Sequence, residues 1–166
     1  MFRFETKAST RARRLKEAVL ASFRSTAAEV EARFAVFGAS DWQRILYWLD
    51  ISGLALYLLD RLTELEVERC IPGAILDRLQ QNLAENRERT AALLQEAAAI
   101  SRAMSRQRIS FALLKGITLT PESVPDCALR WQIDLDFLVA ARDATTARHV
   151  LMGFGYGMHA VCGNTM

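Results

Sequence analysis

The sequence is poor in the residues that mark a disulfide framework, a zinc site or a disordered chain. Its 166 residues include only three cysteines and three prolines. Cys70, Cys127 and Cys162 lie 57 and 35 residues apart, which excludes a disulfide framework and a paired-cysteine zinc site. Hydrophobic residues make up 51% and charged residues 24%, an ordinary globular composition. We therefore expect a cytoplasmic protein with one domain, or one domain that carries a helical extension.

Long hydrophobic runs are also lacking. Between Asp50 and Asp60 nine residues run without a charge, far fewer than the roughly 20 that a membrane-spanning helix needs. The last 18 residues, from His149, carry no formal charge, but they include four glycines and end in Asn-Thr-Met. We expect no membrane partner.

A large net charge is missing from the chain as a whole. The 21 basic and 19 acidic residues leave +2, too little to indicate a nucleic-acid partner. Residues 1–24 nevertheless hold seven basic and two acidic side chains. This basic start favours a solvated helix face or an overlong start of the reading frame, with an organellar transit peptide or a nucleic-acid contact as alternatives. Eighteen of the 21 basic residues are arginine, which fits a GC-rich bacterial genome and weakens the transit-peptide interpretation.

Helical periodicity fills the first two thirds of the chain. We expect a basic amphipathic helix within residues 1–38, whose apolar stripe ends at Phe37 and which Gly38 caps at its C-terminus. Ser40 and Gln43 have the spacing of a capping box, which predicts that the next helix begins there.

Residues 39–108 are expected to form a helical region that packs on the rest of the protein. Gly53 predicts a break, and Pro72 predicts the start of a helix that continues to about Arg108. The apolar stripe of this last helix needs a partner surface. Three polar residues dilute that stripe midway, so one bent helix and two helices remain alternatives: Asn82, Asn86 and Thr90.

The periodicity changes from helical to strand-like after residue 109. Residues 110–114 form a nearly continuous apolar run, which is typical of a buried strand. Residues 117–130 predict a loop with at most one helical turn. Residues 133–140 alternate as a strand does, residues 143–152 predict a helix, and residues 156–161 predict the beginning of a third strand.

Asp134 and Asp136 carry the strongest chemical signal in the chain. Side chains two apart on a strand point the same way, with Cα atoms roughly 6.5–7 Å apart. Two adjacent carboxylates repel and lose solvation unless a cation compensates them. Hard oxygen ligands suit Mg²⁺, which commonly takes one or two carboxylates plus substrate phosphates. From the aspartates alone, the alternative is a half-exposed edge strand whose outer face holds two acids.

Further motifs surround this pair in a specific order. Leu-Leu-Lys-Gly at 113–116 ends in a glycine whose backbone can approach a phosphate closely. Val-Pro-Asp at 124–126, Arg130, Asp-Leu-Asp-Phe-Leu-Val at 134–139 and Gly-Phe-Gly-Tyr at 153–156 follow. In this order the motifs resemble the uncharacterised nucleotidyltransferase family of the polymerase-β-type superfamily, over roughly residues 40–157.

This resemblance implies an α+β or α/β fold, in which residues 109–166 form a partial minimal nucleotidyltransferase core of order β–loop–β–α–β. It implies that Asp134 and Asp136 are catalytic and hold Mg²⁺ or Mn²⁺. Gly116 would face the triphosphate, and Lys115 and Arg130 would supply positive charge to the phosphates. The reaction would be attack of an acceptor hydroxyl on the α-phosphate of a nucleoside triphosphate such as ATP. A small molecule, a protein hydroxyl and an RNA end remain open as acceptors.

Three departures from the family pattern qualify these expectations. Val124 replaces the usual aromatic residue, and Ile133 replaces the small residue that often precedes the first aspartate. The superfamily also uses a third carboxylate on a later strand, whereas no acid follows Asp143 in this chain. We therefore expect a chain that is either truncated or inactive, with little or no transfer. The alternative function is a non-catalytic nucleotide-binding or helical protein-interaction module, and a weaker one is a nucleic-acid-associated protein.

Three other residues have open interpretations. Lys115 is alternatively a strand-end lysine that only reaches solvent. Trp131 is most simply a half-buried aromatic residue, although a nucleotide base could stack on it beside Arg130. His159 has half of a zinc-site spacing with Cys162, and since no second pair exists we expect no zinc there.

Overall fold

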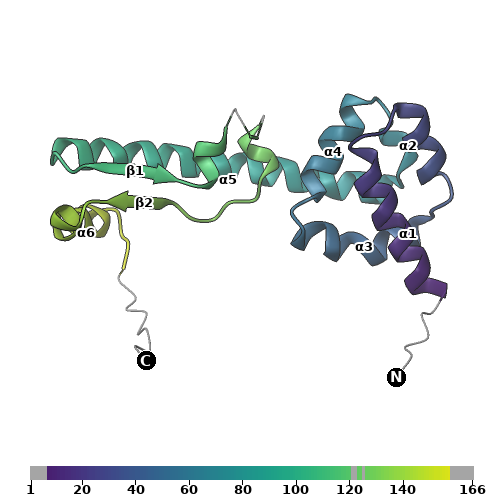
Figure 1. Cartoon of the computed structure of the whole chain (residues 1–166), viewed down its shortest axis with the longest axis horizontal. Coiled ribbons are helices and arrows are strands. Elements are labelled where there is room, and N and C mark those ends of the chain that lie inside the picture. Colours follow the sequence, from purple (N-terminus) through teal and green to yellow (C-terminus); the bar gives the residue numbers. More distant parts are fainter. Residues whose placement is uncertain (1–6, 121–122, 125, 158–166) are drawn as a thin grey trace, which may run out of the picture. The chain divides into compact units, whose positions relative to one another are not determined.

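The computed structural model describes residues 7–120, 123–124 and 126–157 (Figure 1). It confirms a mixed α+β fold, with helices first and a small antiparallel sheet after them. The chain forms two compact units. The first comprises Met1–Glu88 and Asp126–Trp131, and the second comprises Arg89–Pro125 and Gln132–Met166. Within the described residues, every helix is too short or too polar to cross a bilayer.

The first unit is built from helices. Its elements are α1 (Lys7–Ser22), α2 (Ala27–Phe34), α3 (Ala39–Ile51), α4 (Ala55–Glu64) and the first part of α5 (Gly73–Arg106). The prediction of one helix within residues 1–38 is wrong, because α1 ends at Ser22 and Thr26 begins a new helix. The Thr26 backbone N–H donates to Glu29 Oε2 at 2.8 Å, and the Glu29 N–H donates back to Thr26 Oγ1. This reciprocal capping box is what starts α2.

Gly38 and Asp41 correct the predicted boundary between the next two helices. Gly38 does not cap the C-terminus of a preceding helix; it is the N-cap of α3, in an extended conformation. The capping partner is Asp41, whose Oδ2 accepts from the Gly38 N–H at 3.2 Å, and not the predicted pair of Ser40 and Gln43. Gly53 does break the chain before α4, with φ +70°. Helix α5 is continuous from Gly73 to Arg106, so the single-helix alternative is confirmed.

One apolar cluster lies inside the first unit. Phe34 and Trp42 form its aromatic centre, with ring centroids 5.1 Å apart in an edge-on arrangement. The fully buried residues around them come from α1 to α5: Leu15, Val19, Val30, Ile45, Leu49, Leu58, Leu62 and Leu79. Because α1 contributes to this cluster, residues 7–22 are an integral part of the folded unit.

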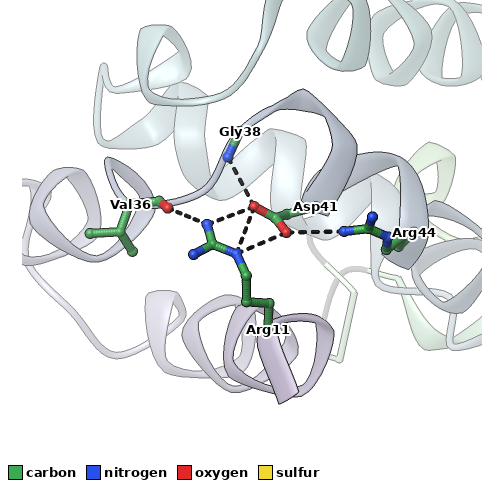
Figure 2. Close-up of polar contacts among 5 residues, drawn as sticks. All are labelled: Arg11, Val36, Gly38, Asp41 and Arg44. Carbon is green, nitrogen blue, oxygen red and sulfur yellow. Dashed lines mark hydrogen bonds and ion pairs between the residues drawn. The ribbon is translucent and has the colours of Figure 1, made fainter. Parts of the chain in front are cut away.

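An ion-pair network joins α1 to the start of α3 (Figure 2). Arg11 donates to the Asp41 carboxylate from Nε at 3.1 Å and from Nη2 at 2.8 Å, and Nη2 also donates to the Val36 carbonyl at 2.7 Å. Gly38 and Arg44 approach the same carboxylate, and Asp41 is only 5% exposed. The Arg11 hydrogen bond is the main cause that lowers the pKa of Asp41 below its ordinary value.

Two of the basic residues near the start of the chain also have aromatic partners. The Arg11 guanidinium lies 5.6 Å from the centre of the Phe37 ring, and Lys16 Nζ lies 5.1 Å from the Trp48 ring. Such cation–π contacts hold the two cations against the first unit. Part of the basic excess at the start of the chain therefore serves internal packing.

The second unit contains a two-stranded sheet among its described residues. Strand β1 (Phe111–Leu114) pairs antiparallel with β2 (Asp136–Val139), with Phe111 opposite Val139 and Leu114 opposite Asp136. One face of the sheet packs on α5 and on α6 (Ala144–Gly153). Ile100, Met104, Ile109 and Ala147 are the buried residues of this cluster, with Phe111, Leu135, Phe137 and Val139 packed against them.

The sheet differs from the prediction in its length and its burial. Strand β1 is not fully buried, since its residues alternate between half-buried and exposed. Strand β2 begins at Asp136 rather than at residue 133, because β1 ends at Leu114 and offers no ladder partner to earlier residues. Ile133 is accordingly 72% exposed. The loop holds two short 3-10 turns instead of at most one, Gly116–Leu119 and Cys127–Leu129. Most of the predicted third strand, residues 158–161, lies outside the described residues.

Candidate functional site

The two aspartates sit at the start of β2, but only one of them is in the strand. Asp136 is the first residue of β2, and its side chain is 32% exposed. Asp134 lies two residues earlier and is exposed. Leu135 and Phe137 pack toward α5, which leaves Asp136 on the other face of the sheet. The strand geometry that predicted a shared face therefore applies to Asp136 and not to Asp134.

Lys115 directly follows β1, at the same end of the sheet as Asp136. Its Nζ lies 3.1 Å from Asp136 Oδ2, so it does more than reach into solvent. Its backbone has φ +55° and ψ −143°, a conformation that is costly for a residue with a Cβ atom. The Thr118 N–H and hydroxyl both donate to the Lys115 carbonyl, at 2.8 and 2.7 Å, and hold the turn that follows.

Gly116 follows Lys115 and lies directly against Gln132. A Cβ atom at position 116 would be 1.7 Å from Gln132 Oε1 and 2.6 Å from its Cδ, so no side chain fits there while Gln132 keeps its place. Gln132 is 6% exposed, and its Nε2 has no hydrogen-bond partner among the described residues. The sequence indicated a glycine for close approach to a phosphate, whereas the structure shows a close approach to a glutamine. Gln132 was missed because a single polar residue in a loop carries no periodic signal.

Arg130 belongs to the first unit, whereas Lys115, Gly116, Asp134 and Asp136 belong to the second. Arg130 is partly exposed and ends the short turn Cys127–Leu129. The structure thus brings four of the five predicted residues into one unit.

Asn86 holds the segment that carries Arg130, and sequence reasoning missed its role. Its side-chain Nδ2 donates to the Ala128 carbonyl at 2.6 Å and to the Arg130 carbonyl at 3.1 Å, and Asn86 is fully buried. Asp126 closes the turn by accepting from the Ala128 N–H at 2.8 Å. The only signal of Asn86 in the sequence is that it interrupts an apolar stripe, which does not reveal its partner.

The donor set suits a magnesium ion by its chemistry, but the structure does not place both carboxylates on one strand face. Asp134 and Asp136 offer hard carboxylate oxygens and are accessible to solvent. No group of three or more histidine, cysteine or acidic residues that could hold a metal occurs in the part of the chain that the structure describes. Two carboxylates suit Mg²⁺ only if water and phosphate oxygens complete its coordination. Lys115 now occupies one of these oxygens, so an incoming cation would compete with it.

Comparisons with known proteins place these residues in a family. A family model described as "Uncharacterised nucleotidyltransferase" matches residues 38–164, which include all five candidate residues. No curated protein and no solved structure matches the chain. The family match covers well over half of the sequence, from the start of α3 to beyond α6. The chain therefore belongs to the uncharacterised nucleotidyltransferase family.

Proposed function

We propose that the protein transfers a nucleoside monophosphate from a nucleoside triphosphate to an acceptor hydroxyl, with Mg²⁺ or Mn²⁺. The observation that carries this proposal is the meeting of the two strand ends. There Lys115, Gly116 and Asp136 place a cation, a glycine backbone and a carboxylate together within the family's matched range. Accessible side chains of both charges at the strand ends suit a substrate that combines phosphates with a divalent cation.

The transfer forms one bond and breaks another at the α-phosphorus. The acceptor oxygen attacks this phosphorus, the bond to the bridging oxygen breaks, pyrophosphate leaves, and the hydroxyl proton passes to water. Negative charge builds up on the phosphate oxygens during this step. Lys115 would offset that charge, and compensation of this kind is usually the largest single contribution to such reactions. Arg130 belongs to the other unit, and its role at the phosphates is proposed from the family resemblance alone.

The remaining residues would bind and orient the triphosphate. Asp134 and Asp136 would hold the divalent ion, which supplies charge compensation and fixes the geometry of the phosphates when bound. Gly116 is partly exposed and would bring its backbone to the phosphates only on the side that Gln132 does not cover. Lys115 Nζ would exchange Asp136 Oδ2 for a phosphate oxygen, because a carboxylate that holds a cation no longer needs the charge of the lysine.

The Lys115–Asp136 ion pair also favours a second candidate, a module that binds nucleotide without transferring it. If Lys115 stays paired with Asp136, only Asp134 of the two aspartates is left to bind a cation. Such a module would bind the triphosphate through its phosphates and release no pyrophosphate.

Transfer is tested with the four nucleoside triphosphates labelled at the α-phosphate, Mg²⁺ or Mn²⁺, and a cell extract as the source of acceptors. As the missing third carboxylate predicts, we expect only slow label transfer with pyrophosphate release by wild type, and its loss in Asp136→Asn. Asp77→Asn is the matched control, because Asp77 is an exposed acid on α5 outside the site. Binding without pyrophosphate release would favour the second candidate. Transfer that survives in Asp136→Asn would contradict the proposed site.

A further inference from the structure

The first unit contains a pocket that the proposed chemistry does not use. It has a volume of about 420 Å³, which lies in the range of small-ligand pockets. The end of α3, the start of α4, one face of α5 and the segment Asp126–Trp131 line it. All of these belong to the first unit, so the pocket is a property of that unit alone.

The floor of the pocket is apolar and its wall is aromatic. Leu56 and Leu129 are 6% and 2% exposed, and they form an aliphatic part of the pocket lining. Trp131 lines the same pocket and is 57% exposed, although a tryptophan usually buries most of its surface. Exposed tryptophan rings are the side chains on which planar bases stack.

Hydrogen-bond donors and acceptors also line the pocket, beside these apolar residues. Asn82 carries an amide donor and a carbonyl acceptor, and Glu85 carries a carboxylate whose Oε1 accepts from Gln81 at 2.9 Å. Arg78 pairs with Asp50 at 2.5 Å, which fixes two further charged groups of the lining. These polar groups line the pocket beside its apolar residues, so a planar ring with donors and acceptors along its edge would contact both. An asparagine amide matches the adenine edge, which pairs one donor with one acceptor.

The segment that supplies the aromatic wall is held firmly in place. Asn86 bonds the carbonyls of Ala128 and Arg130, so the backbone on the N-terminal side of Trp131 is anchored to α5. A backbone that is anchored in this way needs less ordering when a ligand binds to the side chain of Trp131, which favours affinity.

We propose that this pocket binds the base of a purine nucleoside, stacked on Trp131 and read by Asn82 and Glu85. The inference rests on the proposed function in one respect only, which is that a nucleotidyltransferase meets nucleosides as substrates. The pocket binds the ring, and the binding requires neither phosphate nor metal.

The test uses adenosine as the probe, because it has the ring without the phosphates. Binding to the full chain is measured by calorimetry without divalent ions, in wild type, Trp131→Ala and Tyr47→Ala. Tyr47 is the matched control, since it is 75% exposed on α3 and does not line the pocket. We expect Trp131→Ala to weaken binding about 5- to 150-fold and Tyr47→Ala to leave it unchanged. Asn82→Ala should reduce the preference for adenosine over uridine.

Two results would overturn the inference. One is adenosine binding that Trp131→Ala leaves intact. The other is that wild type does not bind adenosine, although it still binds ATP with Mg²⁺ in a way that depends on Asp136. This second result would leave the proposed function unaffected. If adenosine binds through Trp131 but no triphosphate is transferred, the proposed function fails and the pocket remains.

Discussion

The two units of the molecule differ in how they use their side chains. The first unit encloses a large aromatic and aliphatic cluster and closes α1 onto α3 with a nearly buried carboxylate. The cluster of the second unit has only four buried residues among those described, and its strands are half exposed. Yet four of the five candidate residues lie in the second unit. Packing and candidate chemistry are therefore concentrated in different parts of the chain, as expected when reactive groups must stay accessible.

The strongest test of this contrast is Trp42→Ala. Trp42 is fully buried against Phe34, so its loss should destabilise the first unit by about 3–5 kcal/mol. Tyr47→Ala, on the exposed side of the same helix, should change stability by less than about 0.5 kcal/mol. Hydrogen exchange separates the units, and the amides of α1 to α4 should lose protection first. Equal losses in β1 and β2 would show that the two units unfold as one.

Gly116→Ala tests packing inside the second unit. The added Cβ meets Gln132 Oε1, and overpacking of this kind should cost about 1–3 kcal/mol. Gln132→Ala removes the colliding atoms, so the double variant should recover most of the loss in thermal unfolding. If the double variant is no more stable than Gly116→Ala alone, the close approach of Gln132 is not the reason for the glycine.

Asp41→Asn tests the ion-pair network of the first unit. Removing the carboxylate charge should cost about 1–2 kcal/mol at neutral pH, because it weakens the charged hydrogen bonds from Arg11. The pKa of Asp41 is lowered in the folded state, so its contribution is present above the unfolded value of about 3.9 and is lost as the pH falls through the lower folded pKa. Denaturant unfolding between pH 7 and pH 2.5 should show the difference between wild type and variant shrink in acid. A difference that grows in acid would contradict the assignment.

Lys115→Met should have the smallest effect on stability and an informative effect on binding. An ion pair as exposed as the one with Asp136 contributes less than about 1 kcal/mol, so unfolding should change little. Calorimetry should show tighter binding of Mg²⁺ alone, because Lys115 no longer competes for the carboxylate. ATP should bind more weakly, because a phosphate partner is lost. Parallel changes in both affinities would mean that Lys115 does not alternate between the two partners.

Much of the secondary structure follows from sequence periodicity. The strand at 111–114, the helix from 144 and the two ends of α5 were predicted within a few residues, while the choice between one bent helix and two was left open. The break before α2 was missed although Thr26 and Glu29 have capping-box spacing, because the apolar stripe appeared to run through it. Local sequence patterns predict local elements, and this boundary was missed because the capping-box spacing and the apolar stripe gave conflicting predictions.

The contacts that build the candidate site could not be predicted in the same way. Whether Asp134 joins the strand depends on where its partner strand ends, which is a property of the pairing and not of the residue. Asn86 binds a carbonyl 42 residues later in the chain, and Gln132 packs against Gly116, which precedes it by 16 residues. Neither contact leaves a periodic pattern in the sequence. Candidate residues can thus be named from motifs, but their partners require the structure.

The bonds from Asn86 also have a consequence for the order in which the protein is synthesised. The two carbonyls that Asn86 binds follow it by 42 and 44 residues, so the first unit is not contiguous in the chain. A ribosome has released all of α1 to α4 well before residues 126–131 emerge, and until then Asn86 lacks these two acceptors. The first unit can therefore complete its packing only after residues 126–131 have been synthesised. A segment that carries a candidate functional residue is thus the last part of the first unit to be synthesised.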